Sequence, residues 1–272
     1  AGTGPGGPAM ARSPSALVVF PQEWTPFGDE SGAPRNHAWW QRCVYPRGAA
    51  VNELDLVRSQ LRESMLDGAH RPTVEVVRIE RIQHRRLYKR FADKRDEIAV
   101  KCGGAANVLR LWHGTGETDP DVILRSESGL DERMSSQGFY GKGVYFAEYA
   151  RYSNGDKDRG YFHSNRASGH RQLLLCKVLC GNVKDFGGAI KRGLNPAKDL
   201  VDERRSTATV QVVFDSVRGG PHRPGHGGGG ENDSAMLVVY RNTQVYPAYL
   251  VTYKKTAASG QPRGAAAAFA SR

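Results

Sequence analysis

The 272-residue sequence lacks long hydrophobic runs and any excess of acidic residues. The apolar stretch at residues 16–20 is too short for the core of a secretory signal peptide and far too short to cross a membrane. The first acidic residue is Glu23, and Arg12 and several serines precede it, which leaves an organelle-targeting leader open. We therefore expect no membrane partner.

Cysteine is also scarce, with four residues in the whole chain. So few cysteines do not form a disulfide framework, which favours a reducing, intracellular compartment, either nuclear or cytoplasmic. Cys176 and Cys180 fall in a predicted strand, where four residues span about 13 Å, too far for both sulfurs to bind one metal. His222 and His226 fall in a glycine-rich stretch that reads as a loop. We expect no metal site.

Large apolar residues are missing from both ends of the chain. Such segments cannot bury enough surface to offset the entropy of ordering them, so residues 1–20 and 255–272 are predicted to be a flexible leader and a flexible tail. The segment between, residues 38–254, is predicted to be a single domain.

Hydrophobic periodicity within that domain predicts an α+β fold with a mostly antiparallel sheet, because helices interrupt runs of short strands without regular alternation. A bulge is expected near Val76 and Val77. Helices are predicted over residues 53–66, 85–98 and 119–128, and strands over 73–83, 109–113, 143–147, 171–180, 209–214, 236–241 and 249–254.

The formal net charge is +11, which favours polyanionic partners. Six Lys or Arg residues cluster within 84–95, whereas Leu87, Phe91 and Ile98 recur at helical spacing. This pattern predicts an amphipathic helix whose basic face is solvated. We expect at most weak, non-specific binding to nucleic acid and keep a nucleic-acid-binding protein as an alternative.

Two segments carry candidate functional residues. In "LRLWHGTGETDP" an alternating strand ends at His113, and the glycines that follow allow a close approach to the backbone. In "GFYGKGVYFAEYARYS" three glycines stand beside tyrosines, and a flat ring fits between a tyrosine face and bare backbone. A glycine turn and a hairpin with core aromatics are the alternative interpretations. No strand–turn–helix of the dinucleotide-binding type surrounds these glycines.

Six segments, in this order, resemble the catalytic domain of the poly(ADP-ribose) polymerase-like ADP-ribosyltransferases. The resemblance covers about residues 50–254 and is nearest to the tankyrase and mono-ADP-ribosyltransferase branches. It implies the ADP-ribosyltransferase fold, a mostly antiparallel split sheet flanked by helices in a single domain. The segments are "VVRIERIQHRRLYKRFADKRDEI", "LWHGT", "GKGVYFAEYARYS", "LLLCKVLCG", "FDSV" and "VVYRNTQVYPAYL".

The resemblance also implies a site for NAD, used as a substrate. His113 matches the histidine that binds a ribose hydroxyl, and Gly114 matches the glycine whose backbone bonds the nicotinamide amide. Thr115 stands where a small hydroxyl residue contacts the cofactor. Tyr145 matches the tyrosine that packs on the nicotinamide ring, and Ser153 matches the serine that bonds the carboxamide. His113 and Tyr145 are thus the predicted catalytic residues.

A second stacking tyrosine follows that serine in the family. Tyr161 is the best candidate here, although the gap is longer than usual.

One position departs from the chain-elongating members of the family. Where they carry a glutamate that orients the acceptor ribose, this chain has Met236. A thioether has no charge and is only a weak acceptor, so it cannot activate a hydroxyl. Glu231 and Asp233 lie upstream at offsets that do not bring them to the same strand face without a bulge. The sequence predicts transfer of single ADP-ribose units to protein acceptors, or an inactive NAD-site fold that acts as a binding or scaffold module.

Overall fold

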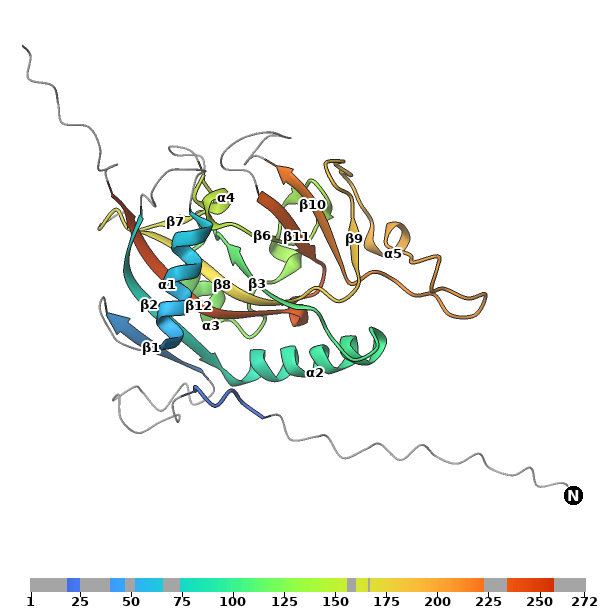
Figure 1. Ribbon diagram of the computed structural model, residues 1–272, viewed down its shortest axis with the longest axis horizontal. Helices are drawn as coiled ribbons and strands as arrows, with labels where there is room; N and C mark the ends of the chain where they lie inside the picture. The colour runs from blue at the N-terminus through green and yellow to red at the C-terminus, as the bar shows by residue number, and fades with distance from the viewer. Residues whose placement is uncertain are drawn as a thin grey trace, which may run out of the picture.

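The computed structural model describes residues 19–24, 40–46, 52–65, 74–155, 160–165, 167–222 and 234–256 (Figure 1). Its centre is a ten-stranded sheet in the order β1-β2-β12-β8-β3-β6-β11-β10-β9, in which β7 also pairs with β8. The described strand pairs are antiparallel except for β9 and β10, which run parallel. The predicted α+β class with a mostly antiparallel sheet is confirmed.

The sheet consists of two halves joined at one point. Strands β3 and β6 meet through a single Cα pair, Trp112 with Ala147. This narrow junction corresponds to the predicted split of the sheet. The first half contains β1 (Trp40–Pro46), β2 (Val74–His84), β12 (Val245–Lys255), β8 (Arg171–Leu179), β3 (Val108–His113) and β7 (His163–Ser164). The second half contains β6 (Val144–Ala147), β11 (Ser234–Val239), β10 (Ser216–His222) and β9 (Val183–Asp185), and β4 (Gln137–Gly138) and β5 (Gly141–Lys142) form a separate hairpin.

Helices cover the first half on both faces. In Figure 1, α1 lies across β2, β12 and β8, and α2 runs along the lower edge of the sheet. Both helices bury apolar side chains in one cluster with Leu173 and Leu175, whereas Leu124 of α3 packs on the opposite face with Leu174. The helices are α1 (Asn52–Ser64), α2 (Arg85–Lys101), α3 (Pro120–Arg125), α4 (Ala150–Asn154) and α5 (Pro196–Asp199), with 3₁₀ turns η2 (Glu132–Met134) and η3 (Asn242–Gln244).

Of two local predictions, one is confirmed and the other is wrong. The bulge predicted near Val76 and Val77 is confirmed, because Thr252 pairs with Arg78 while Tyr253 pairs with Val76. The strand predicted over residues 209–214 is wrong. That stretch makes only an isolated bridge, between Val201 and Val213, and the strand lies further on, in β10. Its valines are not buried in a core: Val212 is half-buried, and Val210 is 58% exposed.

Residues 19–24 pack on the domain although they precede its predicted start. The Trp24 ring lies 5.1 Å from that of Tyr88 and 6.1 Å from that of Tyr246. Phe20 stacks on Trp24 at 5.2 Å. Residues 1–18 and 257–272, which make up most of the predicted leader and tail, lie outside the described residues.

No helix in the described part of the chain is long and apolar enough to span a membrane. In the same ranges, no group of three or more His, Cys, Asp or Glu could hold a metal ion. His226, Glu231 and Asp233 lie outside the described residues.

Candidate active site

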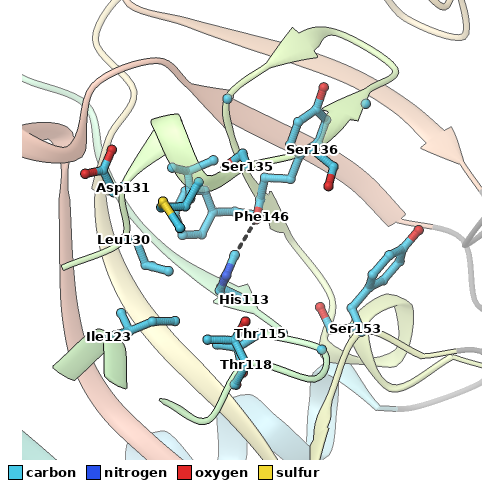
Figure 2. Close-up of a pocket in the computed structure, with 18 of the residues that line it drawn as sticks. His113, Thr115, Thr118, Ile123, Leu130, Asp131, Ser135, Ser136, Phe146 and Ser153 are labelled. Carbon is cyan, nitrogen blue, oxygen red and sulfur yellow. Dashed lines mark hydrogen bonds between the residues drawn. The ribbon is translucent and has the colours of Figure 1, made fainter. Parts of the chain in front are cut away.

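A cavity of about 870 Å³ opens where the two half-sheets meet. This volume is within the range of small-molecule sites, about 300–1,000 Å³. Figure 2 shows His113 near its middle, with Ser153 at one end and Asp131 at the other. The structure brings all six predicted site residues to its walls: His113, Gly114, Thr115, Tyr145, Ser153 and Tyr161.

His113 stands at the end of β3 and contacts the neighbouring half-sheet. Its Nδ1 lies 2.8 Å from the backbone oxygen of Tyr145 (Figure 2). A carbonyl oxygen only accepts, so Nδ1 donates its proton there and Nε2 keeps a lone pair. Burial lowers the pKa of His113 and outweighs the opposite effect of this hydrogen bond. The ring is therefore neutral at neutral pH and offers an acceptor at Nε2.

Tyr145 in β6 is held by its hydroxyl. The hydroxyl donates to the backbone oxygen of Gly141 at 2.7 Å and accepts from the backbone nitrogen of Tyr140 at 2.9 Å. Burial raises the pKa of Tyr145 to about 12, so the phenol stays protonated at neutral pH. The arrangement suits Tyr145 to present a fixed ring face rather than to transfer protons.

Gly138 makes this position of Tyr145 possible. A Cβ at residue 138 would lie 2.5 Å from the hydroxyl-bearing ring carbon of Tyr145. Gly143 likewise leaves space for Val238 and Tyr240. These glycines therefore accommodate the protein's own side chains, whereas the sequence suggested a slot for the ring of a ligand.

The Tyr161 segment forms a wall against the glycine turn after β3. The Tyr161 backbone nitrogen donates to Ser153 O at 2.8 Å, and its oxygen accepts from the Gly116 nitrogen at 2.7 Å. A Cβ at Gly114 would lie 2.2 Å from that same oxygen, so only glycine fits there. The Tyr161 ring stacks on Tyr152 at 5.8 Å and 15°. The longer gap after Ser153 therefore still brings Tyr161 to the cavity.

The two hydroxyl residues differ in their surroundings. The Thr115 hydroxyl donates to the backbone oxygen of Thr118 at 2.6 Å, so its proton is engaged within its own turn. Ser153 is buried in α4 and lines the cavity. Both oxygens retain the capacity to accept a hydrogen bond.

Met236 occupies the wall formed by β11. Its side chain is 4% exposed, lies opposite Ala147 and packs in a cluster with Tyr140 and Leu200. Asp131 is the only acidic residue among the described residues that line the cavity. The guanidinium of Arg133 bonds that carboxylate and lowers its pKa to about 2. No carboxylate from the described chain stands at the position of Met236.

Other cavity residues were not found from the sequence. Tyr152 directly precedes Ser153 in the same motif, so the sequence could have indicated it as a cavity residue. Phe139 and Arg192 also line the cavity, and Arg192 comes from a loop without any recognisable pattern. An apolar wall is contributed by Val122, Ile123, Leu130 and Met134.

Comparison with known proteins agrees with this geometry. The poly(ADP-ribose) polymerase catalytic domain family matches residues 52–255, and the chain therefore belongs to that family. Domains of this family use NAD as their substrate.

The individual relatives share about a quarter to a third of their aligned residues with this chain. The chain is 31% identical over 208 residues to a probable poly [ADP-ribose] polymerase of Dictyostelium discoideum, covering 75% of this chain and 50% of the relative. It is 28% identical over 186 residues to the protein mono-ADP-ribosyltransferase PARP12 of Mus musculus, covering 67% and 22%. Identity to the protein mono-ADP-ribosyltransferase PARP14 of Homo sapiens is 24% over 180 residues, covering 66% and 9%. The chain spans half or less of these relatives' lengths.

Proposed function

We propose that this chain is an NAD-dependent protein ADP-ribosyltransferase that transfers single ADP-ribose units and releases nicotinamide. Family membership supports the reaction type, and the cavity at the junction of the half-sheets supports the substrate site. The observation that carries the restriction to single units is Met236, buried in the cavity wall.

The polar groups of the cavity suit NAD. His113 Nε2 would accept a hydrogen bond from a ribose hydroxyl, since Nδ1 is already engaged. Ser153 and the backbone of Gly114 would bond the carboxamide of nicotinamide, and the ring of Tyr145 would pack on its face. Cleavage of the bond between nicotinamide and ribose passes through an oxocarbenium-like state, so these residues chiefly hold the two rings in position.

Chain elongation would need a group that prepares a ribose hydroxyl of the growing polymer. The Met236 thioether has neither the charge nor the basicity for this. Asp131, the one described acid in the wall, is bonded by Arg133. The described walls therefore favour one transfer per acceptor site.

A second candidate is an inactive NAD-site fold that serves as a binding or scaffold module. Met236 favours it too, because a buried methionine fills space in a strand wherever no catalytic group is needed. An intracellular location, nuclear or cytoplasmic, also belongs to the proposal. Its support is that all four cysteines are free.

Labelled NAD tests the two candidates. We expect the pure protein to release nicotinamide and to give one discrete modified band on a denaturing gel. A ladder of long polymer would contradict single-unit transfer. NAD binding without release of nicotinamide would instead support the scaffold module.

A further inference from the structure

The loop between β9 and α5 is docked against the hairpin that borders the cavity. The backbone nitrogen of Lys191 donates to Phe139 O at 3.0 Å, and the Tyr140 hydroxyl donates to Ala189 O at 2.9 Å. Leu194 is buried beside them. The hydrogen bond of Lys191 and the burial of Leu194 thus fix the position of residue 192 between them.

Arg192 extends from this loop into the cavity wall. Its guanidinium carbon lies 4.9 Å from the centre of the Phe139 ring. Phe139 itself packs against the cluster that contains Met236. Gly193 has a φ of 73°, so the chain turns directly after Arg192. The adjacent Lys191 instead pairs with Asp199 at 2.9 Å.

The charge of Arg192 has no counterpart in the described part of the chain. Among the described residues, its guanidinium lies over the Phe139 ring and acts electrostatically on the phenol of Tyr145, and it has no carboxylate partner there. Arg192 is also the only Lys or Arg among the described residues lining the cavity. A guanidinium without a carboxylate partner on a ligand cavity is suited to bind an anion, such as a carboxylate or a phosphate.

We infer that Arg192 binds the carboxylate of an acidic acceptor side chain and positions it for transfer. This inference rests on the proposed function. An Asp or Glu side chain, with a pKa of about 4, is already ionised at neutral pH, so no base has to remove a proton from it. An acceptor of this class is therefore compatible with Met236, whereas a hydroxyl acceptor needs the base that is missing.

The bond changes balance without a further reactant. A carboxylate oxygen of the acceptor bonds to the ribose carbon that carries nicotinamide. The bond from that carbon to the ring nitrogen breaks, and its electron pair stays on nitrogen. The pyridinium charge and the carboxylate charge cancel, which leaves an ester and neutral nicotinamide. Arg192 takes no part in these bond changes and acts by position.

The experiment compares acceptor use with hydrolysis of NAD by water. Its probes are a peptide with one glutamate and the same peptide with glutamine. The variants are Arg192→Ala, Arg192→Lys and, as the matched control on the same loop, Lys191→Ala. For Arg192→Ala we expect the ratio of peptide transfer to hydrolysis to fall about tenfold to a hundredfold, chiefly through KM for the peptide.

The controls separate charge from structure. Arg192→Lys is expected to restore part of the ratio, and Lys191→Ala to behave as the wild type. Neutral hydroxylamine should release the label from the glutamate peptide, as it does from an ester, and the glutamine peptide should remain unlabelled. A rise in KM for NAD equal to that for the peptide would mean that Arg192 serves the phosphates of NAD, and would overturn the inference. Equal labelling of both peptides would overturn it too.

A binding measurement tests the role of Arg192 in case the protein has no enzymatic activity. If the wild type releases no nicotinamide, the proposed function fails, and the glutamate peptide is titrated into the NAD-loaded protein by calorimetry. Binding that is lost in Arg192→Ala and kept in Lys191→Ala would support the role of Arg192. No binding, or equal binding in all variants, would overturn it.

Discussion

The two half-sheets differ in the length and burial of their strands and in what they contribute to the cavity. In the first half β2 and β12 are 11 residues long, and β8 is buried on both faces. In the second half β6 has four residues, and its neighbourhood contains the glycines and tyrosines of the cavity. The first half is a scaffold with a buried core on both faces, whereas the second half and the segments beside it contribute many of the glycines and aromatic side chains of the cavity.

The site exists because the two halves barely pair. Between β3 and β6 one Cα pair remains, and beyond it the strands leave room for side chains and a ligand. His113 comes from the first half and Tyr145 from the second, and the hydrogen bond from His113 Nδ1 to the Tyr145 oxygen crosses the junction. Because the sheet is interrupted here, polar groups from the ends of β3 and β6 lie together at the cavity.

Breaking the junction should have the largest effect. Trp112 is 0% exposed and pairs with Ala147, the one Cα pair in the strand register of β3 and β6. Trp112→Ala is expected to lower the free energy of unfolding by about 3–5 kcal/mol through loss of burial and a residual cavity. Urea unfolding of the wild type and the variant measures this change in the free energy of unfolding. Leu56→Ala, at a 61% exposed position, is the control and should cost less than about 0.5 kcal/mol. Equal costs would refute the special role of the junction.

Acid should destabilise the scaffold half through His84. This residue ends β2, and its Nδ1 accepts from Leu87 N at 3.1 Å, which caps α2. Burial lowers the pKa of His84 to about 4, so the unfolded chain binds the extra proton between that pH and about 6.5. Stability should therefore fall as the pH falls through this range, by at most about 3 kcal/mol.

His84→Asn provides the comparison for this prediction, because asparagine keeps a capping acceptor and does not titrate. Urea midpoints between pH 7 and 4 should be less pH-dependent in the variant. Identical pH profiles would show that other groups cause the acid sensitivity.

Removing the group that spans the junction should impair activity more than folding. His113→Ala loses the acceptor for a ribose hydroxyl, worth about 1–3 kcal/mol, or about 5- to 150-fold in the rate of nicotinamide release. His170→Ala, a histidine outside the cavity, is the control. Release at the wild-type rate by His113→Ala would show that the site is assigned incorrectly.

The smallest effect is expected on the basic face of α2. Its apolar residues Leu87, Phe91 and Ile98 are buried, as predicted, and Lys89 and Lys94 form ion pairs along the helix. Any binding to DNA or RNA should be weak and should fall steeply with salt, because it arises from counterion release. Filter binding at several salt concentrations measures this. Tight, sequence-selective binding at physiological salt would instead favour a nucleic-acid-binding protein.

The sequence predicted local features well wherever burial follows the pattern. Leu87, Phe91 and Ile98 are buried at helical spacing, and the bulge at Val77 occurs as expected. The pattern failed at residues 209–214, because alternation alone does not show whether a core exists to cover one face. The six predicted cavity residues came from motifs, whose order along the chain carries information on position in the fold.

What the sequence determined by itself is the family, the strand that ends at His113 and the presence of a methionine, without charge, at position 236. Each of these depends on residue identity and on near neighbours in the chain. Only the tertiary structure decided that Gly138 makes room for Tyr145, that Tyr161 reaches the cavity and that Arg192 enters its wall. These contacts join segments from different loops, and their distances depend on how the two half-sheets pack, which no local pattern encodes.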